Sequence, residues 1–231
     1  MRMETSLDLT QPSNKLVCSY GGLVNWRAKR KGNVMIKNKE IILSHGNRRG
    51  REIALDIVEY AVNAVNGYAS TKRMVHAKNS ELTVENLRYD LARLENVYVI
   101  GAGKATFSIA QALDEILGER ISRGIVIVKR GERRRLRHVR VIEAGHPVPD
   151  QKGLEGTKEI VEIAKSVKKD DLVFCIITGG ASALMPWPAA NVGFEDKKIV
   201  TEMLLRSGAK IDEINAVRKH ISSIKGGKLA K

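Results

Sequence analysis

The 231-residue chain contains 43% hydrophobic residues and carries a formal net charge of +14, a composition that suits one large domain with a core of ordinary size. It has no apolar run of the roughly 18 to 20 residues that a membrane span needs, and its start lacks the basic-then-apolar order of a secretory signal. We therefore expect a cytoplasmic protein with no membrane partner. Neither of its cysteines, Cys18 and Cys175, indicates a disulfide framework or a metal site, and Cys175 falls in an apolar run that predicts a buried position.

The positive charge is concentrated in two stretches of the chain. Residues 1–51 hold 11 Lys and Arg against 3 Asp and Glu, and residues 129–140 hold 7 against 1. The remaining sequence is electrically balanced, unlike the evenly basic surface that follows a phosphate backbone. We therefore expect no nucleic-acid partner.

In chain order, a basic tail precedes alternating helices and strands. Residues 1–40 lack a sustained period, which predicts a poorly ordered tail, and Met35 raises the hypothesis that translation starts there. Residues 41–231 form the expected folded domain, which opens with an amphipathic helix from Arg51 to a stop at Gly67. Strands are then predicted at 97–100, 124–128, 139–143 and 172–177, and helices at 104–117, 153–167, 195–207 and 212–224.

The four predicted strands are apolar and β-branched without polar alternation, which indicates burial on both faces. This pattern predicts an α/β domain with a doubly wound, mainly parallel sheet and helices on both faces, a Rossmann-like three-layer arrangement. Ligands of such sheets gather at the carboxyl ends of the strands. We therefore expect the site in the turns that follow the strands.

Two glycine-rich turns follow predicted strands. Residues 101–106 read Gly-Ala-Gly-Lys-Ala-Thr, which is neither a dinucleotide fingerprint nor a Walker A loop. Lys104 would oppose the dipole of the following helix unless an anion lay between the lysine and the backbone amides. Residues 178–182 read Thr-Gly-Gly-Ala-Ser, which would let amides and hydroxyls approach a phosphate. For both, the alternative is an ordinary tight turn between strand and helix.

Two further segments carry polar residues that could meet an anion. In residues 144–150, prolines fix the backbone around His146 and Asp150, and a structural histidine is the alternative there. On the last predicted helix, Asn215, Arg218 and Lys219 share a face that could clamp an anion or simply be solvated. A cationic glycine turn follows at residues 225–228.

These motifs resemble those of class II glycerate kinases, the family that makes 2-phosphoglycerate and carries a leucine-rich C-terminal domain. The matching segments are GAGKA at 101–105, EAGHPVPD at 143–150, TGGASAL at 178–184 and EINAVRKHISSIKGGKLA at 213–230. The resemblance covers roughly residues 41–231. It implies ATP-dependent phosphorylation of D-glycerate at the 2-hydroxyl with Mg²⁺, in a cleft between this domain and a C-terminal domain that we expect to be absent from this chain.

The resemblance also suggests roles for individual residues. The expected catalytic residues are Lys104, Asn215 and Arg218. The expected substrate-binding and phosphate-binding residues are Gly101, Gly103, Gly179, Gly180, Ser182, His146, Asp150, Lys225 and Gly226. The general base stays open between Asp150, Asp212 and His220, and no metal ligands are identified. Ala181 stands where the family has a third glycine, which questions the loop geometry if that position needs a positive φ.

Three alternatives remain at this stage. The chain could be a hydroxypyruvate reductase, although it lacks the dinucleotide fingerprint expected of one. It could instead be a non-catalytic, truncated remnant that needs a separate C-terminal domain. The third alternative is a basic binding module that uses the tail and the arginines at 133–135, for which a 4% aromatic content offers few stacking platforms.

Overall fold

The computed structural model describes residues 16–18, 22–24, 36–131 and 135–231. These residues fall into two compact units, Met1–Asn63 and Ala64–Lys231, each described by itself below. Most of the predicted tail, Met35 and two arginines of the 133–135 cluster lie outside the described residues. In the described part of the chain, no helix combines the length and the apolar character required to cross a membrane.

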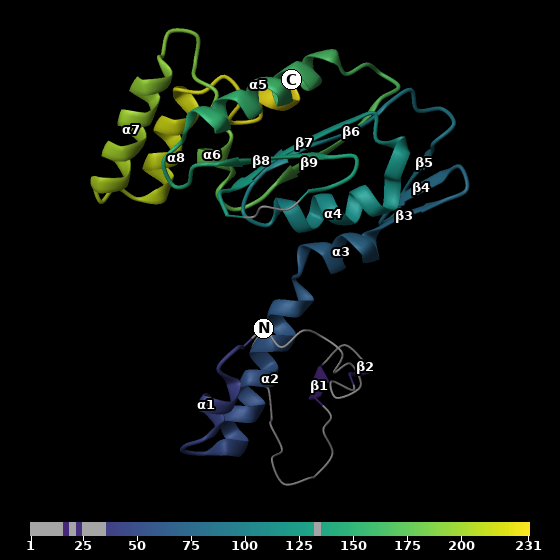
Figure 1. The fold of residues 1–231 in the computed structure, drawn as a ribbon, viewed down its shortest axis with the longest axis vertical. Coiled ribbons are helices and arrows are strands. Elements are labelled where there is room, and N and C mark those ends of the chain that lie inside the picture. The colour runs from purple at the N-terminus through teal and green to yellow at the C-terminus, as the bar shows by residue number, and fades with distance from the viewer. Residues whose placement is uncertain (1–15, 19–21, 25–35, 132–134) are drawn as a thin grey trace, which may run out of the picture. The chain divides into compact units, whose positions relative to one another are not determined.

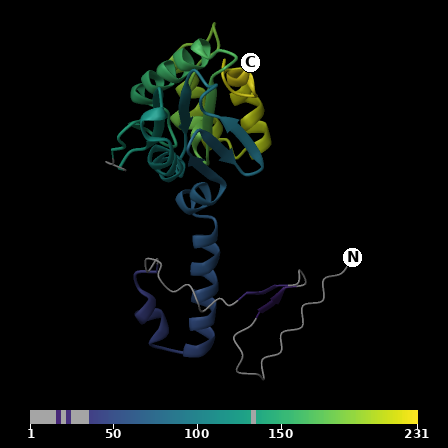
Figure 2. The same ribbon diagram turned by 90° about the vertical axis from the view of Figure 1, so that its right-hand side faces the viewer.

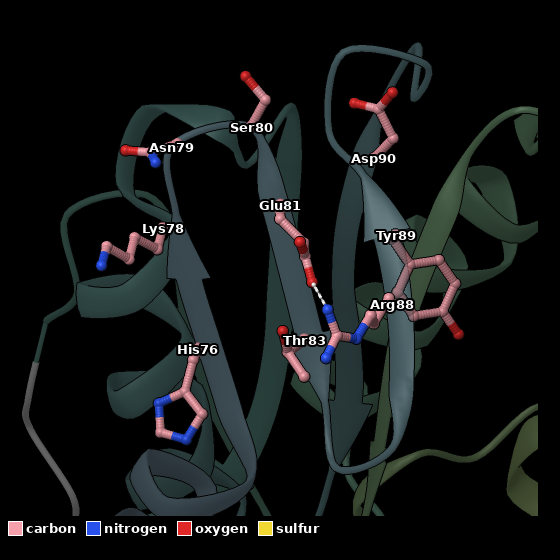
Figure 3. A pocket seen from close by; sticks show the side chains of 9 residues that line it. All are labelled: His76, Lys78, Asn79, Ser80, Glu81, Thr83, Arg88, Tyr89 and Asp90. Atoms are coloured by element: carbon pink, nitrogen blue, oxygen red, sulfur yellow. Dashed lines mark hydrogen bonds and ion pairs between the residues drawn. The ribbon is translucent and has the colours of Figure 1, made fainter.

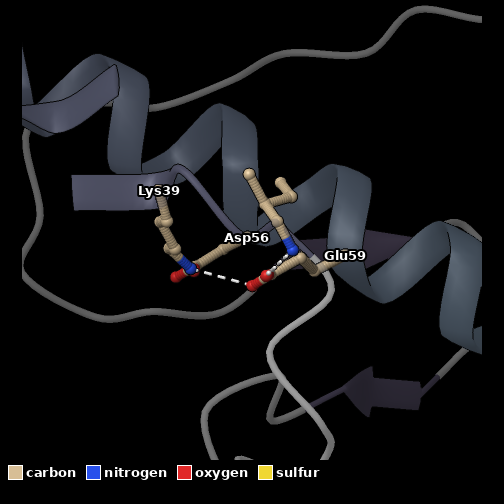
Figure 4. Close-up of polar contacts among 4 residues, drawn as sticks. Lys39, Asp56 and Glu59 are labelled. Atoms are coloured by element: carbon tan, nitrogen blue, oxygen red, sulfur yellow. Dashed lines mark hydrogen bonds and ion pairs between the residues drawn. The ribbon is translucent and has the colours of Figure 1, made fainter. Parts of the chain in front are cut away.

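The first unit contains a short hairpin and two helices. Strands β1 (Leu16–Cys18) and β2 (Gly22–Val24) pair antiparallel, and α1 (Lys39–Leu43) precedes α2 (Arg48–Ala64). Lys39 Nζ donates to Asp56 at 3.0 Å and to Glu59 at 2.8 Å (Figure 4). The bond from Lys39 lowers the pKa of Glu59. This ion-pair network therefore joins α1 to α2.

The amphipathic helix predicted after Arg51 is present, but its end and its burial differ from expectation. It ends at Ala64, and Gly67 begins the next helix, α3 (Gly67–Met74), because Asn66 caps it by accepting from the Ala69 amide at 3.1 Å. Ile57 is 60% exposed, and no residue of α2 is buried. The apolar stripe of α2 is therefore not part of a core in the described structure.

After α3, the second unit continues with a small sheet that the sequence did not predict. Strands β3 (Val75–Lys78), β4 (Glu81–Val84) and β5 (Leu87–Asp90) form an antiparallel meander joined by two-residue turns. The turns place Asn79 at φ +55° and Glu85 at φ +52°. Glutamate is not a typical residue for this left-handed conformation, and each strand has only four residues. These features explain why the sequence pattern does not indicate the meander.

The main sheet confirms the predicted fold class. Its strands are β6 (Val97–Ala102), β7 (Arg123–Lys129), β8 (Arg140–Ala144) and β9 (Leu172–Ile177). All pairings are parallel, in the order β8-β7-β6-β9. The crossover helices are α4 (Thr106–Leu117), which continues into the 3₁₀ turn η2 (Gly118–Arg120), and α5 (Gln151–Ser166). All four predicted strands are therefore present.

The two crossover helices cover opposite faces of this sheet, as Figure 1 and the turned view in Figure 2 show. On the α4 face, Phe107 and Leu113 pack with Val99 and with the meander residue Leu82. The core on the α5 face is formed by residues Ile100, Ile125, Ile127, Ile160 and Ile163, among others. Apolar burial on both faces is what the β-branched strands predicted.

The prediction that the strand at 172–177 is buried on both faces was wrong. β9 lies at the edge of the described sheet and pairs with β6 alone. Cys175 is exposed and Ile177 is 54% exposed, because α5 packs mainly over β7 and β8. Strand order cannot be read from one strand's composition, so an apolar strand was mistaken for a central one.

The remaining elements follow β9. They are α6 (Ala181–Leu184), α7 (Phe194–Arg206), α8 (Ile211–His220) and the 3₁₀ turn η3 (Lys228–Ala230). Helix α8 ends earlier than the predicted residue 224, because Ser222 bridges to Pro188 and the Ser223 amide donates to the Trp187 carbonyl at 3.2 Å. These contacts fix the segment that leads to Lys225.

Candidate active site

The strand order places two glycine loops side by side at the carboxyl edge of the sheet. From β6 the chain moves to β7 and β8 on one side, and it returns to β9 on the other side of β6. Such a topological switch point is where open α/β sheets bind ligands. The loops after β6 and β9 are joined here, because the Lys104 amide donates to the Gly179 carbonyl at 2.9 Å and the Thr178 amide donates to Ala102 at 3.1 Å.

Thr178 links these two loops through its side chain. Its Oγ1 accepts from the Ala105 amide at 3.2 Å and lies 3.1 Å from Thr106 Oγ1. Gly103 has φ +141°, and a Cβ there would lie 1.9 Å from Thr178 Oγ1. The contact requires glycine at this position. The Thr178 hydroxyl, expected to be a ligand donor, is therefore engaged within the protein.

The loop after β9 leaves several backbone amides available. Gly180 has φ +93°, and Ala181 begins α6 without a positive φ. Alanine at the third-glycine position is therefore compatible with the loop, which resolves the concern raised by the sequence. The amides of Gly179, Gly180 and Ser182 have no acceptor among the described residues. Such amides are suited to an anion.

Lys104 and His146 converge on this loop. Lys104 lies two residues before α4 and not within its first turn as predicted, since Ala105 is the N-cap. The Lys104 side chain is exposed and forms no ion pair in the described part of the chain. A Cβ on Gly180 would lie 3.0 Å from His146 Nε2 and 3.3 Å from Lys104 Cγ. A side chain at position 180 would therefore meet both His146 and Lys104.

The environment of His146 favours a neutral imidazole. Burial is the main cause that lowers the pKa of His146, and the charges of Lys104, Lys129 and Arg218 lower it further. Arg218, on α8, is therefore among the charges that act on His146. An imidazole that is neutral at pH 7 can accept a proton.

Asp150, predicted to meet substrate or act as a base, has both carboxylate oxygens engaged. Oδ1 caps α5 by accepting from the Gly153 amide at 3.0 Å, and Oδ2 pairs with Arg130 at 2.7 Å. The other candidate bases lie in α8, where Asp212 is exposed and His220 Nδ1 lies 2.7 Å from the Ala216 carbonyl. Of these candidates, Asp150 and His220 are therefore engaged within the protein.

The structure brings part of the predicted cationic segment into the site. Arg218 is half-buried, and burial lowers its pKa, whereas Lys219 is exposed. Asn215 is half-buried on the same helix. Lys225 Nζ donates to the Met185 carbonyl at 2.9 Å, just after α6. Gly226, at φ +69°, turns the backbone after Lys225.

Lys197 of α7 is a residue that sequence reasoning missed. It is 3% exposed, and its Nζ donates to the Ile221 carbonyl at 2.7 Å. Burial, together with the charge of Arg218, lowers the pKa of Lys197 to about 8. In the sequence the only signal is the spacing of Lys197 and Thr201, which are four residues apart and are the buried residues of α7.

Residues 53–231 match a protein family described as a domain of unknown function, DUF4147. The chain belongs to the DUF4147 family. It is 42% identical over 181 residues to glycerate 2-kinase of Pyrococcus horikoshii, an alignment that covers 78% of this chain and 40% of that relative. It is 46% identical over 132 residues to an Agrobacterium vitis protein provisionally named hydroxypyruvate reductase, which covers 57% of this chain and 34% of that relative.

A crystal structure of glycerate kinase from Thermotoga maritima resembles the DUF4147 chain with a TM-score of 0.63 and 33% identity, covering 77% of this chain and 40% of that one. The DUF4147 chain thus spans about 40% of the length of these two glycerate kinases. The comparisons confirm the family resemblance and the α/β fold class.

The described residues of the DUF4147 chain do not fit a dedicated Mg²⁺ site. Within 36–131 and 135–231, no group of three or more His, Cys, Asp or Glu is placed to hold a metal ion. Mg²⁺ commonly takes one or two carboxylates together with substrate phosphates and water. Asp150, the acidic residue of the site loops, is already bound to Arg130 and Gly153.

A cavity of about 780 Å³ in the DUF4147 chain lies away from these loops, on the β3–β5 meander (Figure 3). Arg120, just beyond the last turn of α4, donates to the Asn79 carbonyl at 3.3 Å. The meander therefore borders the end of α4 opposite to Lys104. Side chains of both charges line this cavity, including Glu81 and Arg88.

Proposed function

We propose that this chain supplies the substrate-binding α/β domain of a glycerate 2-kinase, which transfers the γ-phosphoryl group of ATP to the 2-hydroxyl of D-glycerate. The observation that carries the proposal is the convergence of Lys104 and His146 on Gly180, beside amides that have no acceptor in the described structure. Glycerate and ATP are both anionic. A site with free amides and an unpaired lysine matches that chemistry. The glycerate kinases among the relatives support it further.

The residues divide the work of phosphoryl transfer between positioning and charge stabilisation. Such transfer needs little covalent chemistry from the protein and depends on alignment and positive charge around the phosphoryl group. Lys104 and the amides of Gly179 and Gly180 would hold an anionic group at the switch point. Arg218 and Asn215 would orient groups from the α8 side. ATP supplies the phosphoryl group, with Mg²⁺ carried on its phosphates.

His146 would accept the proton of the 2-hydroxyl. Its pKa is lowered by burial and by Lys104, Lys129 and Arg218, so it is available as a base at neutral pH. The nearby carboxylate of Asp150 is held by Arg130 and the Gly153 amide. The base therefore comes from the histidine and not from the aspartate of the same loop.

We further propose that catalysis also draws on protein segments equivalent to the rest of the glycerate kinase relatives, of which this chain covers about 40%. Such segments would close over the loops and exclude water during transfer. ATP, Mg²⁺ and D-glycerate would then meet between the two parts, in a cytoplasmic protein.

The decisive test is an assay for ATP-dependent formation of 2-phosphoglycerate from D-glycerate. The 231-residue chain is assayed alone and after mixing with the separately produced remaining portion of the Pyrococcus horikoshii relative. Phosphorus NMR of the product distinguishes the 2-phosphate from the 3-phosphate. We expect 2-phosphoglycerate in at least one arm and higher activity in the mixture.

A parallel arm measures NADH oxidation with hydroxypyruvate under the same conditions. Activity there without 2-phosphoglycerate would replace the kinase with the reductase that the Agrobacterium vitis name suggests. Failure of both arms, together with no binding of D-glycerate, would contradict the proposal.

A further inference from the structure

Three cations meet beside the switch point without an acidic partner. Lys197, Arg218 and Lys225 come from α7, α8 and the turn after α8. The charge of Arg218 lowers the pKa of Lys197, and the charges of Lys197 and Arg218 lower the pKa of Lys225. None of the three forms an ion pair among the residues that the structure describes. Their hydrogen bonds lead to backbone carbonyls, from Lys197 to Ile221 and from Lys225 to Met185. The cluster is therefore an uncompensated positive charge.

The contacts of these cations within the protein account for only part of the positive charge. The Ile221 carbonyl lies at the C-terminal end of α8, where a cation is favourable. Lys228 Nζ already donates to the adjacent Ser222 carbonyl at 2.7 Å. Burying further ammonium groups is unfavourable unless an anion offsets them. Burial is the main cause that lowers the pKa of Lys225 to about 7, and the charges of Lys197 and Arg218 lower it further.

The cluster is physically connected to the glycine loop. Lys225 is bonded to the carbonyl of Met185, which closes α6. Helix α6 begins at Ala181, immediately after Gly180. A ligand that contacts the free amides before α6 can therefore extend along this short segment towards Lys225. A chain of linked anionic groups would span both ends better than one compact anion.

We propose that Lys197, Arg218 and Lys225 form the subsite for a polyphosphate chain, while Lys104 and His146 face the carboxylate-bearing substrate. The assignment to the nucleotide's phosphates rests on the proposed kinase function. A monocarboxylate such as glycerate carries one negative charge and would leave most of the cluster uncompensated. A triphosphate carries several charges and matches three neighbouring cations. Lys225 contacts the chain directly, and buried Lys197 acts as a positioning residue through Ile221 and Arg218.

The test is isothermal titration calorimetry of the full 231-residue chain with inorganic triphosphate and, separately, with D-glycerate, both without metal. Lys225→Met and Lys197→Met remove one charge each while keeping an unbranched side chain. Lys198→Met is the matched control, since Lys198 is the next residue on α7 and pairs with Glu195 at 3.5 Å. We expect about 10-fold to 100-fold weaker triphosphate binding in the first two variants, no more than twofold change in the control, and unchanged glycerate binding in all three.

Proton uptake provides a second measurement. Lys225 faces Lys197 of α7, Arg218 of α8 and the Met185 carbonyl, and the pKa of Lys225 is about 7 in the free protein. At pH 8 a polyanion would raise this pKa, so titrations in buffers of different ionisation enthalpy should show net proton uptake on triphosphate binding. Lys197, with a pKa of about 8, and His146 are the other groups nearby that could take up a proton. Loss of most of the uptake in Lys225→Met assigns it to the cluster.

Several outcomes would overturn the subsite. They are equal triphosphate binding by Lys225→Met and Lys198→Met, binding without proton uptake, or displacement of triphosphate by D-glycerate. If circular dichroism shows that Lys197→Met is unfolded, the partly exposed Lys225 decides alone. Triphosphate binding that behaves as expected in a chain that never yields 2-phosphoglycerate would reject the kinase proposal and keep the polyphosphate subsite.

Discussion

The carboxyl edge of the main sheet and the face of the β3–β5 meander are both polar, yet their charges are arranged in opposite ways. On the meander, Arg88 pairs with Glu81 at 3.1 Å, and both side chains are largely exposed beside a cavity of about 780 Å³. At the carboxyl edge, Lys197 and Lys225 bond to backbone carbonyls and to no carboxylate within the described ranges.

This difference shows that unpaired charge and cavity volume single out different regions of the molecule. In an exposed cross-strand ion pair the two charges offset each other, and the pair contributes little to the free energy of folding. A buried cation without a carboxylate is unfavourable and persists where an anionic ligand offsets it. The charges on the meander are therefore balanced without a ligand, whereas an anion at the carboxyl edge would offset the unpaired cations.

The largest effect should come from Lys104, which would act directly on an anionic group at the switch point. We expect Lys104→Met to lower kcat/KM for glycerate phosphorylation about 100-fold to 1000-fold, the range seen when one charge-stabilising donor is removed. Lys165→Met is the control, because Lys165 is exposed in the last turn of α5. A Lys104→Met enzyme as active as this control would break the assignment of the carboxyl edge as the active site.

The next effect concerns the contacts by which Thr178 links the two glycine loops. Gly103→Ala would place a Cβ 1.9 Å from Thr178 Oγ1 at a backbone φ of +141°, so we expect a loss of about 2–4 kcal/mol in the free energy of unfolding. Gly227→Ala is the matched control, since its φ of +85° is in the left-handed region and nothing lies within 4 Å of the added carbon.

Urea denaturation measures both glycine variants. The control should lose only about 1 kcal/mol, from the left-handed backbone alone. Similar losses of unfolding free energy in the two variants would mean that Thr178 does not link the two loops as described.

The sequence could predict the strands and loops that build this site but not all of its residues. Apolar, β-branched runs located the four strands, and glycines directly after two of them located the loops, because these signals are local. Lys197 was missed since helical periodicity marks a lysine as exposed, and its burial depends on the distant Ile221 carbonyl. The exposure of Cys175 was missed for a related reason, because edge position depends on strand order.

The third prediction concerns the pH dependence of the free energy of unfolding that the unpaired cations should produce. Lys225 has a pKa of about 7 in the folded chain against 10.5 as its ordinary value. Between these pH values the unfolded chain binds the proton and the folded chain does not, so stability should rise with pH in this window. After allowance for solvent screening, we expect a gain of about 1–2 kcal/mol between pH 7 and 9.5.

Urea midpoints at several pH values test this dependence against Lys225→Met. The variant should show a flatter profile, because it has no ammonium group to discharge at that position. A wild-type profile that falls over this window, or one that the substitution leaves unaltered, would argue against a buried, unbalanced cluster.

The smallest effect is expected on the meander, and it sharpens the comparison most directly. Arg88→Met removes the exposed pair with Glu81, so the free energy of unfolding should fall by less than about 1 kcal/mol. Triphosphate binding should stay within twofold of wild type, because the meander borders the opposite end of α4 from Lys104. Urea denaturation and calorimetry measure the two quantities on the same sample. If Arg88→Met weakened triphosphate binding as strongly as Lys225→Met, the anion would reach the cavity of the meander, and charge balance would no longer separate the two regions.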